Sequence, residues 1–97
     1  MGYKEVGKEW EYSESGDFIE GAYLEIETEV GPNKSNLYKL SIGPGEVLSV
    51  WGTTILDQRM RNVTIGDKIK ITYLGLGCAK TGQHAPKLFK VEVFIQD

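Results

Sequence analysis

Alternation of apolar and polar residues between positions 46 and 75 predicts two strands with a helix between them. Val47–Trp51 alternates and is rich in residues that favour β-structure. After the turn Gly66-Asp67 a second segment alternates, with Ile69, Ile71 and Tyr73 on one side. Both segments predict strands, and the apolar side of each is expected to face a core.

The residues between these two strands predict one short helix. Thr54 and Asp57 have the spacing of a capping box, in which two side chains accept hydrogen bonds from each other's backbone amides. Leu56, Met60 and Val63 follow at positions i, i+4 and i+7, which places them on one side of a helix. We expect this helix, over residues 54–61, to be the only substantial one in the chain.

A long first strand is predicted over Asp17–Val30. Its two sides are Leu24, Ile26 and Thr28 on one, and Tyr23, Glu25, Glu27 and Glu29 on the other. Such a strand has one face in water. Gly21 lies inside it, where it permits a bulge or a sharp bend. A long bent first strand is typical of small barrels, because it serves both halves of the sheet.

Two further strands are predicted over Leu37–Ile42 and Lys87–Gln96. A loop of turn-forming residues precedes the first, and a glycine-rich loop over residues 75–86 precedes the second. The expected inward-facing residues are Tyr38, Leu40 and Ile42 in the first, and Phe89, Val91, Val93 and Ile95 in the second. A tight turn at residues 43–45 joins Leu37–Ile42 to the next strand as a hairpin.

The element order predicts an all-β fold, namely a five-stranded antiparallel Greek-key barrel of the OB type with one short helix between strands 3 and 4. Closure into a barrel removes most exposed strand edges. A chain of 97 residues suits one domain. We divide it into a polar lead-in over residues 1–16, from which Trp10 packs back onto the barrel, and an OB domain over residues 17–97.

Composition is that of an ordinary soluble domain, with 40% hydrophobic and 26% charged residues. No apolar run approaches the roughly 18 residues of a membrane span. The charged N-terminal segment lacks the apolar region of a signal peptide, so no membrane partner is expected. Cys78 is the one cysteine, which excludes an internal disulfide and is compatible with a reducing cytoplasm.

The net charge of −3 conceals an uneven distribution. Residues 1–30 carry nine acids and two lysines, whereas residues 31–97 carry nine lysines or arginines and five acids. The later part of the chain is therefore able to form a basic surface, and the local field governs nucleic-acid binding more than the total charge does. The alternative is that both sets of charges are ordinary solvated surface.

Residues 31–40, 50–60 and 66–75 resemble segments of small proteins from tailed phages and prophages. The resemblance covers most of the chain from Trp10 onward, at Trp10, Asp17, Gly21, Gly31–Asn33, Tyr38, Trp51–Gly52, Leu56–Asp57, Met60, Gly66–Asp67, Tyr73–Gly75, Phe89 and Val91–Val93. It implies an OB fold and binding of single-stranded DNA in phage replication or recombination, in the cytoplasm of the bacterial host cell. The chain ends in Phe94-Ile-Gln-Asp97, without the long acidic tail of replication single-strand binders, so recruitment through such a tail is not expected.

The candidate nucleic-acid-binding residues are those at the places where OB folds bind single strands. These places are strands 2 and 3 and the loops between strands 1 and 2 and between strands 4 and 5. Binding there requires aromatic rings that stack on bases and cations that track the phosphates. The candidates are Lys34, Tyr38, Lys39, Trp51, Lys80 and Lys87.

Two interpretations remain open for the aromatic candidates. Trp51 either faces outward beside Lys39, where it can stack on a base, or covers one end of the barrel. Tyr38 shares a side with Leu40, which favours a core position. A strand bound across this face also requires the acids at positions 25, 27 and 29 to lie away from its path.

Catalytic, cofactor and metal sites are not expected. His84 is the only histidine and lies in a glycine-rich loop, and Cys78 has no ligand or base near it in the sequence. We expect a non-enzymatic protein that binds single-stranded DNA with little sequence preference. Further candidate partners are replication or recombination proteins and a second copy of the chain. The alternative is an OB-fold protein–protein adaptor that uses the same face without binding nucleic acid.

Overall fold

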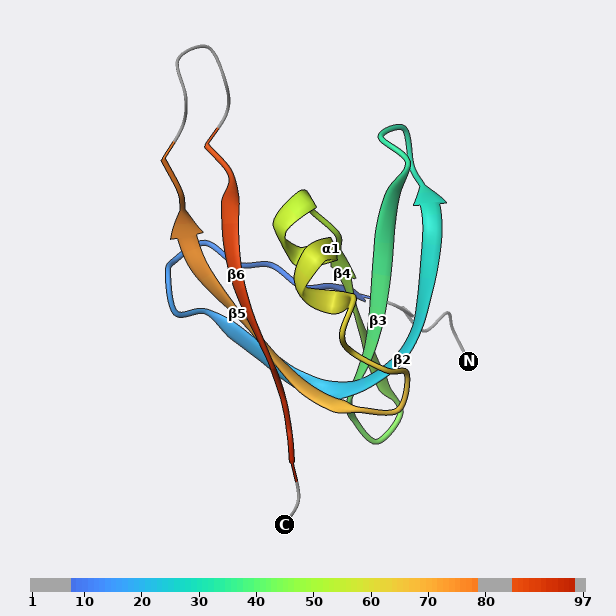
Figure 1. Ribbon diagram of the computed structural model, residues 1–97. Coiled ribbons are helices and arrows are strands. Elements are labelled where there is room, and N and C mark those ends of the chain that lie inside the picture. The colour runs from blue at the N-terminus through green and yellow to red at the C-terminus, as the bar shows by residue number, and fades with distance from the viewer. Residues whose placement is uncertain (1–7, 79–84, 96–97) are drawn as a thin grey trace, which may run out of the picture.

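Six strands and one helix make up the part of the chain that the computed structural model describes, residues 8–78 and 85–95 (Figure 1). They are β1 (Lys8–Glu9), β2 (Phe18–Val30), β3 (Ser35–Gly43), β4 (Glu46–Trp51), α1 (Thr54–Met60), β5 (Lys68–Leu76) and β6 (Lys87–Val93). The strands form one sheet in the order β1-β4-β3-β2-β5-β6, antiparallel except for the β1–β4 pair. The predicted all-β class, with five longer strands and one short helix after the third of them, is confirmed.

Strand β2 belongs to both halves of the sheet. Its first part, Phe18–Ala22, pairs with β5, and the part from Ala22 to Val30 pairs with β3. Gly21 lies where β2 changes its partner from β5 to β3. A Cβ atom there would collide with the backbone carbonyl oxygen of Ser41. Glycine is therefore needed at this position, because it alone lets β3 approach β2 so closely.

A register shift at Leu24 changes which side of β2 faces the core. Tyr23 pairs with Leu40, but the next pair along the strands joins Glu25 to Lys39, so Leu24 is an extra residue that bulges out. Tyr23 is consequently buried in the core, while Leu24 and Ile26 are exposed. The prediction that Tyr23 lies on the wet side with the glutamates is wrong, because the strict alternation behind it does not survive a bulge.

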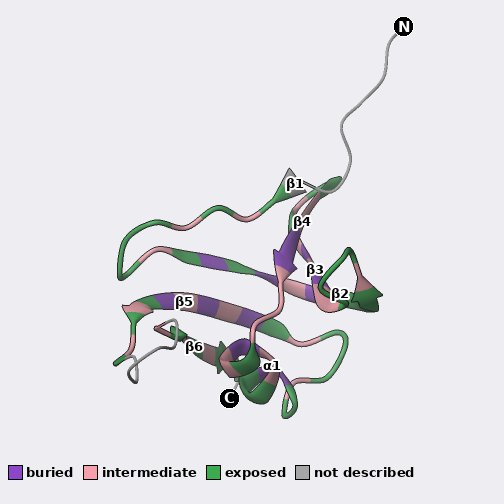
Figure 2. Cartoon of the chain, turned by 90° about the horizontal axis from the view of Figure 1, so that it is seen from above, coloured by how far each residue is buried: buried purple, intermediate pink, exposed green. Residues whose placement is uncertain are grey.

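The hydrophobic core lies between the inner face of the sheet and α1. Its buried residues occupy the first half of β2, the middle of β3 and β5, the end of β4, one side of the helix and the start of β6 (Figure 2). Tyr38, Leu40, Ile69, Ile71, Tyr73 and Phe89 are buried, as the alternation predicted. Ile42, Val93 and Ile95 were expected inside and are exposed, because the strand ends extend beyond the area that the helix covers.

The helix begins one residue earlier than the predicted capping box places it. Thr53, not Thr54, is the N-cap, and its side-chain oxygen accepts a hydrogen bond from the Leu56 amide at 3.3 Å. Gly52 makes this early start feasible, because a side chain there would collide with Asp57 and crowd Asn36. Leu56 and Met60 point into the core, and full burial of such a side chain is worth roughly 1.5–3 kcal/mol.

Within the described residues the sheet is open, with β1 and β6 as its edges. Residues 8–12 run from β4 towards β5 and β6. The Trp10 amide donates to the Ser49 carbonyl at 2.7 Å, and the Tyr12 ring lies 4.6 Å from that of Tyr73 and 5.3 Å from that of Phe89. Trp10 also packs against the core, as predicted, whereas its neighbours in β1 were not predicted to form a strand.

Candidate nucleic-acid interface

Trp51 lies on the outer face of the sheet, at the end of β4. Val50 beside it is fully buried, so the alternation of the strand directs the Trp51 ring outward, where it is partly exposed. Its cross-strand partner is Leu37 of β3. The partial exposure of Trp51 agrees with the predicted outward direction, although Ser49, which the same alternation places on the outer side, is buried. The role of Trp51 as a stacking platform stays a prediction.

The turn between β2 and β3 lies beside the Trp51 ring. The outer edge of the indole is 3.6 Å from the point where a Cβ atom on Gly31 would lie. Gly31 has a φ of 75°, a conformation that favours glycine, and its carbonyl accepts a hydrogen bond from the Lys34 amide at 3.1 Å. An exposed cation, Lys34, therefore belongs to the same tight turn that the indole ring contacts.

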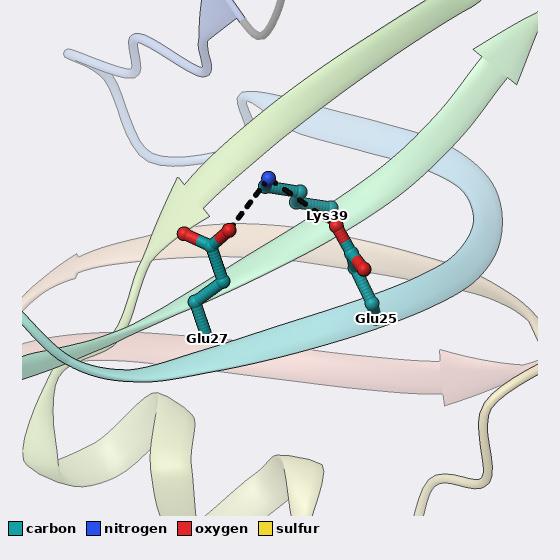
Figure 3. Close-up of polar contacts among 3 residues, drawn as sticks. All are labelled: Glu25, Glu27 and Lys39. Atoms are coloured by element: carbon teal, nitrogen blue, oxygen red, sulfur yellow. Dashed lines mark hydrogen bonds and ion pairs between the residues drawn. The ribbon is translucent and has the colours of Figure 1, made fainter.

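Lys39 is held between two glutamates on the same outer face (Figure 3). Its Nζ lies 2.9 Å from Glu27 Oε1 and 3.2 Å from Glu25 Oε1. Hydrogen bonds to Glu27 and then to Glu25 raise the pKa of Lys39 above its ordinary value. These acids were expected to lie away from the path of a bound strand, and that path was drawn over Lys39. Glu25 and Glu27 instead lie beside Lys39, because the bulge at Leu24 places Glu25 directly opposite Lys39 in the sheet.

Two rows of paired residues cross this surface, which we call the Trp51 face. They are Glu27–Leu37–Trp51 and Glu25–Lys39–Ser49. One lysine and two glutamates thus stand beside the indole, so the rows themselves are acidic. Lys34, in the neighbouring turn, is a cation for which the described residues show no carboxylate partner.

Tyr38 is part of the core and is not available to a base. Its side chain is 2% exposed, and its hydroxyl donates to Asp57 Oδ1 at 2.5 Å. Burial, followed by the hydrogen bond to Asp57, raises the pKa of Tyr38 far above its usual range, so the phenol stays protonated. Tyr38 thus ties β3 to the helix, which corrects its inclusion among the candidate binding residues.

The remaining candidates do not gather around Trp51. Lys87 begins β6, and its Nζ lies 5.5 Å from the centre of the Tyr12 ring. In both views the outer ends of β5 and β6 lie on the opposite side of the molecule from the β2–β3 turn (Figures 1 and 2). Lys80 and His84 lie outside the described residues.

Two exposed phenylalanines form a second aromatic surface that the sequence interpretation missed. Phe18 of β2 is 53% exposed, and Phe94, just after β6, is 63% exposed. The Nζ of Lys70 lies 4.4 Å from the centre of the Phe18 ring, and that of Lys68 lies 5.4 Å from the centre of the Phe94 ring. The sequence signal that could have revealed this surface is the alternation that turns Lys68, Lys70 and Phe94 outward.

No family model, curated protein or solved structure matches this chain. None of the described helices is long and apolar enough to cross a membrane. Across residues 8–78 and 85–95, no three His, Cys, Asp or Glu side chains converge as metal ligands would. The geometry of the outer face therefore carries the functional argument for this protein.

Proposed function

We propose that this protein binds single-stranded DNA with little sequence preference, on the Trp51 face. The observation that carries the proposal is the partly exposed indole of Trp51, directed away from the core and lying against the turn that holds Lys34. Every base has a π face, so an outward indole can stack on a base of any identity. Lys34 would neutralise a neighbouring phosphate in this proposal.

The order of elements supports an OB-type fold as the framework of this proposal. Three antiparallel strands, a short helix and two more strands follow one another, and β2 is shared between the two halves of the sheet. In an OB barrel the third and fifth of these strands would pair. Here α1 packs against β6, and residues 8–12 reach from β4 to the aromatic residues of β5 and β6.

The resemblance to small phage proteins supplies the proposed setting, namely phage DNA replication or recombination in the cytoplasm of the bacterial host. It includes Trp51 and Gly52, and also several residues whose role in the fold is evident. Gly21 permits the close approach of two strands, and Asp57 accepts the Tyr38 hydrogen bond. Trp51 is the residue of the pattern that has an exposed aromatic surface on the outer face.

A titration with labelled oligothymidine tests the proposal. We expect the protein to bind the single strand at low salt, and to bind a duplex of equal length less tightly. Stacking contributes roughly 1–3 kcal/mol per base, so Trp51→Ala should weaken binding about tenfold or more. Trp51→Phe retains a ring and should lose less affinity. If Trp51→Ala remains folded by circular dichroism and binds normally, Trp51 is not the stacking platform.

The second candidate function is that of a protein–protein adaptor using the same face. The observation that favours it is the pair of glutamates on Lys39, which leaves the rows beside Trp51 acidic. Such a surface suits a partner protein that presents a basic rim around an apolar contact for the indole. An adaptor would bind no bare oligonucleotide at any salt concentration, which separates the two candidates.

A further inference from the structure

The outer face of the other half of the sheet, formed by β2, β5 and β6, carries its own ordered set of side chains. Cross-strand pairing places them in three rows: Phe18–Thr72–Lys90, Glu20–Lys70–Glu92 and Ala22–Lys68–Phe94. Phe94 joins the last row because its amide donates to the Lys68 carbonyl at 2.8 Å. Ile69, Ile71 and Tyr73 between these positions are buried, so all three rows face outward.

Within these rows the aromatic rings and the cations are in contact with one another. The ammonium groups of Lys70 and Lys68 lie over the rings of Phe18 and Phe94, and among the described residues neither lysine forms an ion pair. Lys90 contacts Glu92 at 3.7 Å, in a pair that is mostly exposed to solvent. We call Phe18, Lys68, Lys70, Lys90 and Phe94 the Phe–Lys face.

We propose that the Phe–Lys face is a second binding surface for single-stranded nucleic acid. It rests on the proposed function in that the ligand is the same, but it is a separate surface. Bases would stack on Phe18 and Phe94, and Lys68, Lys70 and Lys90 would neutralise phosphates. Strand geometry places the two phenylalanines about 16 Å apart at opposite corners of the rows, which leaves room for several nucleotides between them.

Charge complementarity supports this occupant. The Phe–Lys face with its two glutamates has three lysines against two acids, whereas the rows of the Trp51 face have one lysine against two acids. An ammonium over a ring can move to a phosphate without leaving a carboxylate unpaired, and the ring it uncovers is then free to stack on a base. Lys39 would have to leave two glutamates to do the same.

The two faces should engage separate stretches of nucleic acid. Glu20, Glu25 and Glu27 all project outward from β2, the strand that contributes to both faces, and they repel a phosphate backbone that runs along β2 from one face to the other. We therefore expect one chain to bind two short oligothymidines, each of about four to six nucleotides, in line with the site sizes of OB folds.

The test is the stoichiometry and affinity of short oligothymidine at low salt, measured by titration calorimetry on the full chain. The double variant Phe18→Ala/Phe94→Ala should bind one oligothymidine instead of two, and Trp51→Ala should weaken the other binding event about tenfold or more. Ile65→Ala is the matched control, because Ile65 is 56% exposed and lies outside both faces. Lys68→Ala/Lys70→Ala should weaken the same event that the phenylalanine variant removes.

Each outcome separates this inference from the proposed function. A folded Phe18→Ala/Phe94→Ala variant that binds like the wild type overturns the inference about the Phe–Lys face. If Trp51→Ala is then the variant that weakens binding, the proposed function of the Trp51 face still holds. A wild type that binds no oligothymidine removes both. Competition by polyglutamate as strong as by oligothymidine would show a surface that selects charge without stacking, and would also overturn the inference.

Discussion

The two halves of the outer face use the same kinds of residue in different arrangements. On the Trp51 face the one cross-strand lysine, Lys39, is bound by two carboxylates and the aromatic ring stands apart from it. On the Phe–Lys face Lys68 and Lys70 lie over the aromatic rings, and Lys90 alone pairs with a carboxylate, that of Glu92. The availability of a lysine to a phosphate therefore depends on its cross-strand neighbours more than on the number of lysines.

A single extra residue in β2 accounts for much of this difference. The bulge at Leu24 shifts the pairing, so that Glu25 faces Lys39 and Glu27 faces Leu37. Before the bulge, Glu20 faces Lys70, but the Lys70 ammonium lies over Phe18 instead. The neighbouring ring thus offers the cation an alternative to the carboxylate, which the Trp51 face does not offer to Lys39.

The largest effect is expected from a change at the position that joins the two halves. Gly21→Ala places a Cβ against the Ser41 carbonyl, and backbone cannot move aside as a flexible side chain can. We expect a loss of at least about 1–3 kcal/mol in the free energy of unfolding, measured with urea. Gly43→Ala is the control, since its Cβ would meet only the end of the Glu46 side chain. Equal stability of both variants would contradict the close approach of β2 and β3 at Gly21.

A smaller effect, on binding, is expected from the carboxylates around Lys39. Glu25→Gln/Glu27→Gln removes two negative charges from the Trp51 face and frees Lys39 for phosphate. Affinity for oligothymidine should rise several-fold, and the log–log salt dependence should steepen by about 0.7 for the added phosphate contact. Glu29→Gln removes one negative charge from the same strand without touching Lys39, so half of the double variant's effect or more in this control would point to charge alone. If Glu29→Gln raises the affinity as much as the double variant does, the ion pairs of Lys39 with Glu25 and Glu27 do not limit binding.

The smallest effect concerns Asp17, which positions the start of β2 beside Phe18. Its Oδ2 accepts hydrogen bonds from the amides of Ser13 at 2.9 Å and Glu14 at 3.0 Å, and these bonds lower its pKa. A carboxyl whose pKa is lower in the folded state stabilises the fold above its unfolded pKa, and this stabilisation is lost as the pH falls through the folded value. Asp17→Asn should therefore flatten the loss of stability between about pH 5 and pH 2, in urea titrations. If the free energy of unfolding of Asp17→Asn falls at acid pH as steeply as that of the wild type, these hydrogen bonds do not stabilise the loop.

Most of the fold was predictable because alternation and turn residues are local signals. The five longer strands, the single helix and the burial of Tyr38, Tyr73 and Phe89 follow from residues close together in the sequence. The bulge at Leu24 and the parallel pairing of β1 with β4 were not predictable, because both depend on which segments meet across the sheet. The N-cap at Thr53 was missed because two threonines stand in succession and either can cap the helix.

The candidate site was predictable in part, for the same reason. The outward direction of Trp51 follows from the alternation of β4, but the ion pairs of Lys39 follow from the bulge in a different strand. Phe18 and Phe94 are 76 positions apart in the sequence, and only the pairing of both β2 and β6 with β5 brings them onto one face. Predicting which side chains share a surface thus requires the register of the paired strands, which a single sequence does not specify.

The most direct test of single-strand binding is the affinity of the wild type for oligothymidine between low and physiological salt. Lys34, Lys68 and Lys70 have no ion-pair partner among the described residues, and each phosphate that they neutralise adds about 0.7 to the log–log slope of its own binding event. We therefore expect a slope of about −0.7 for the Trp51 face, from Lys34, and of about −1.4 for the Phe–Lys face, from Lys68 and Lys70. Trp51→Ala should lower the affinity of the Trp51 face without changing the slope of that face, because stacking releases no counterions. Failure of the wild type to bind even at the lowest salt concentration would contradict the account and favour the adaptor function.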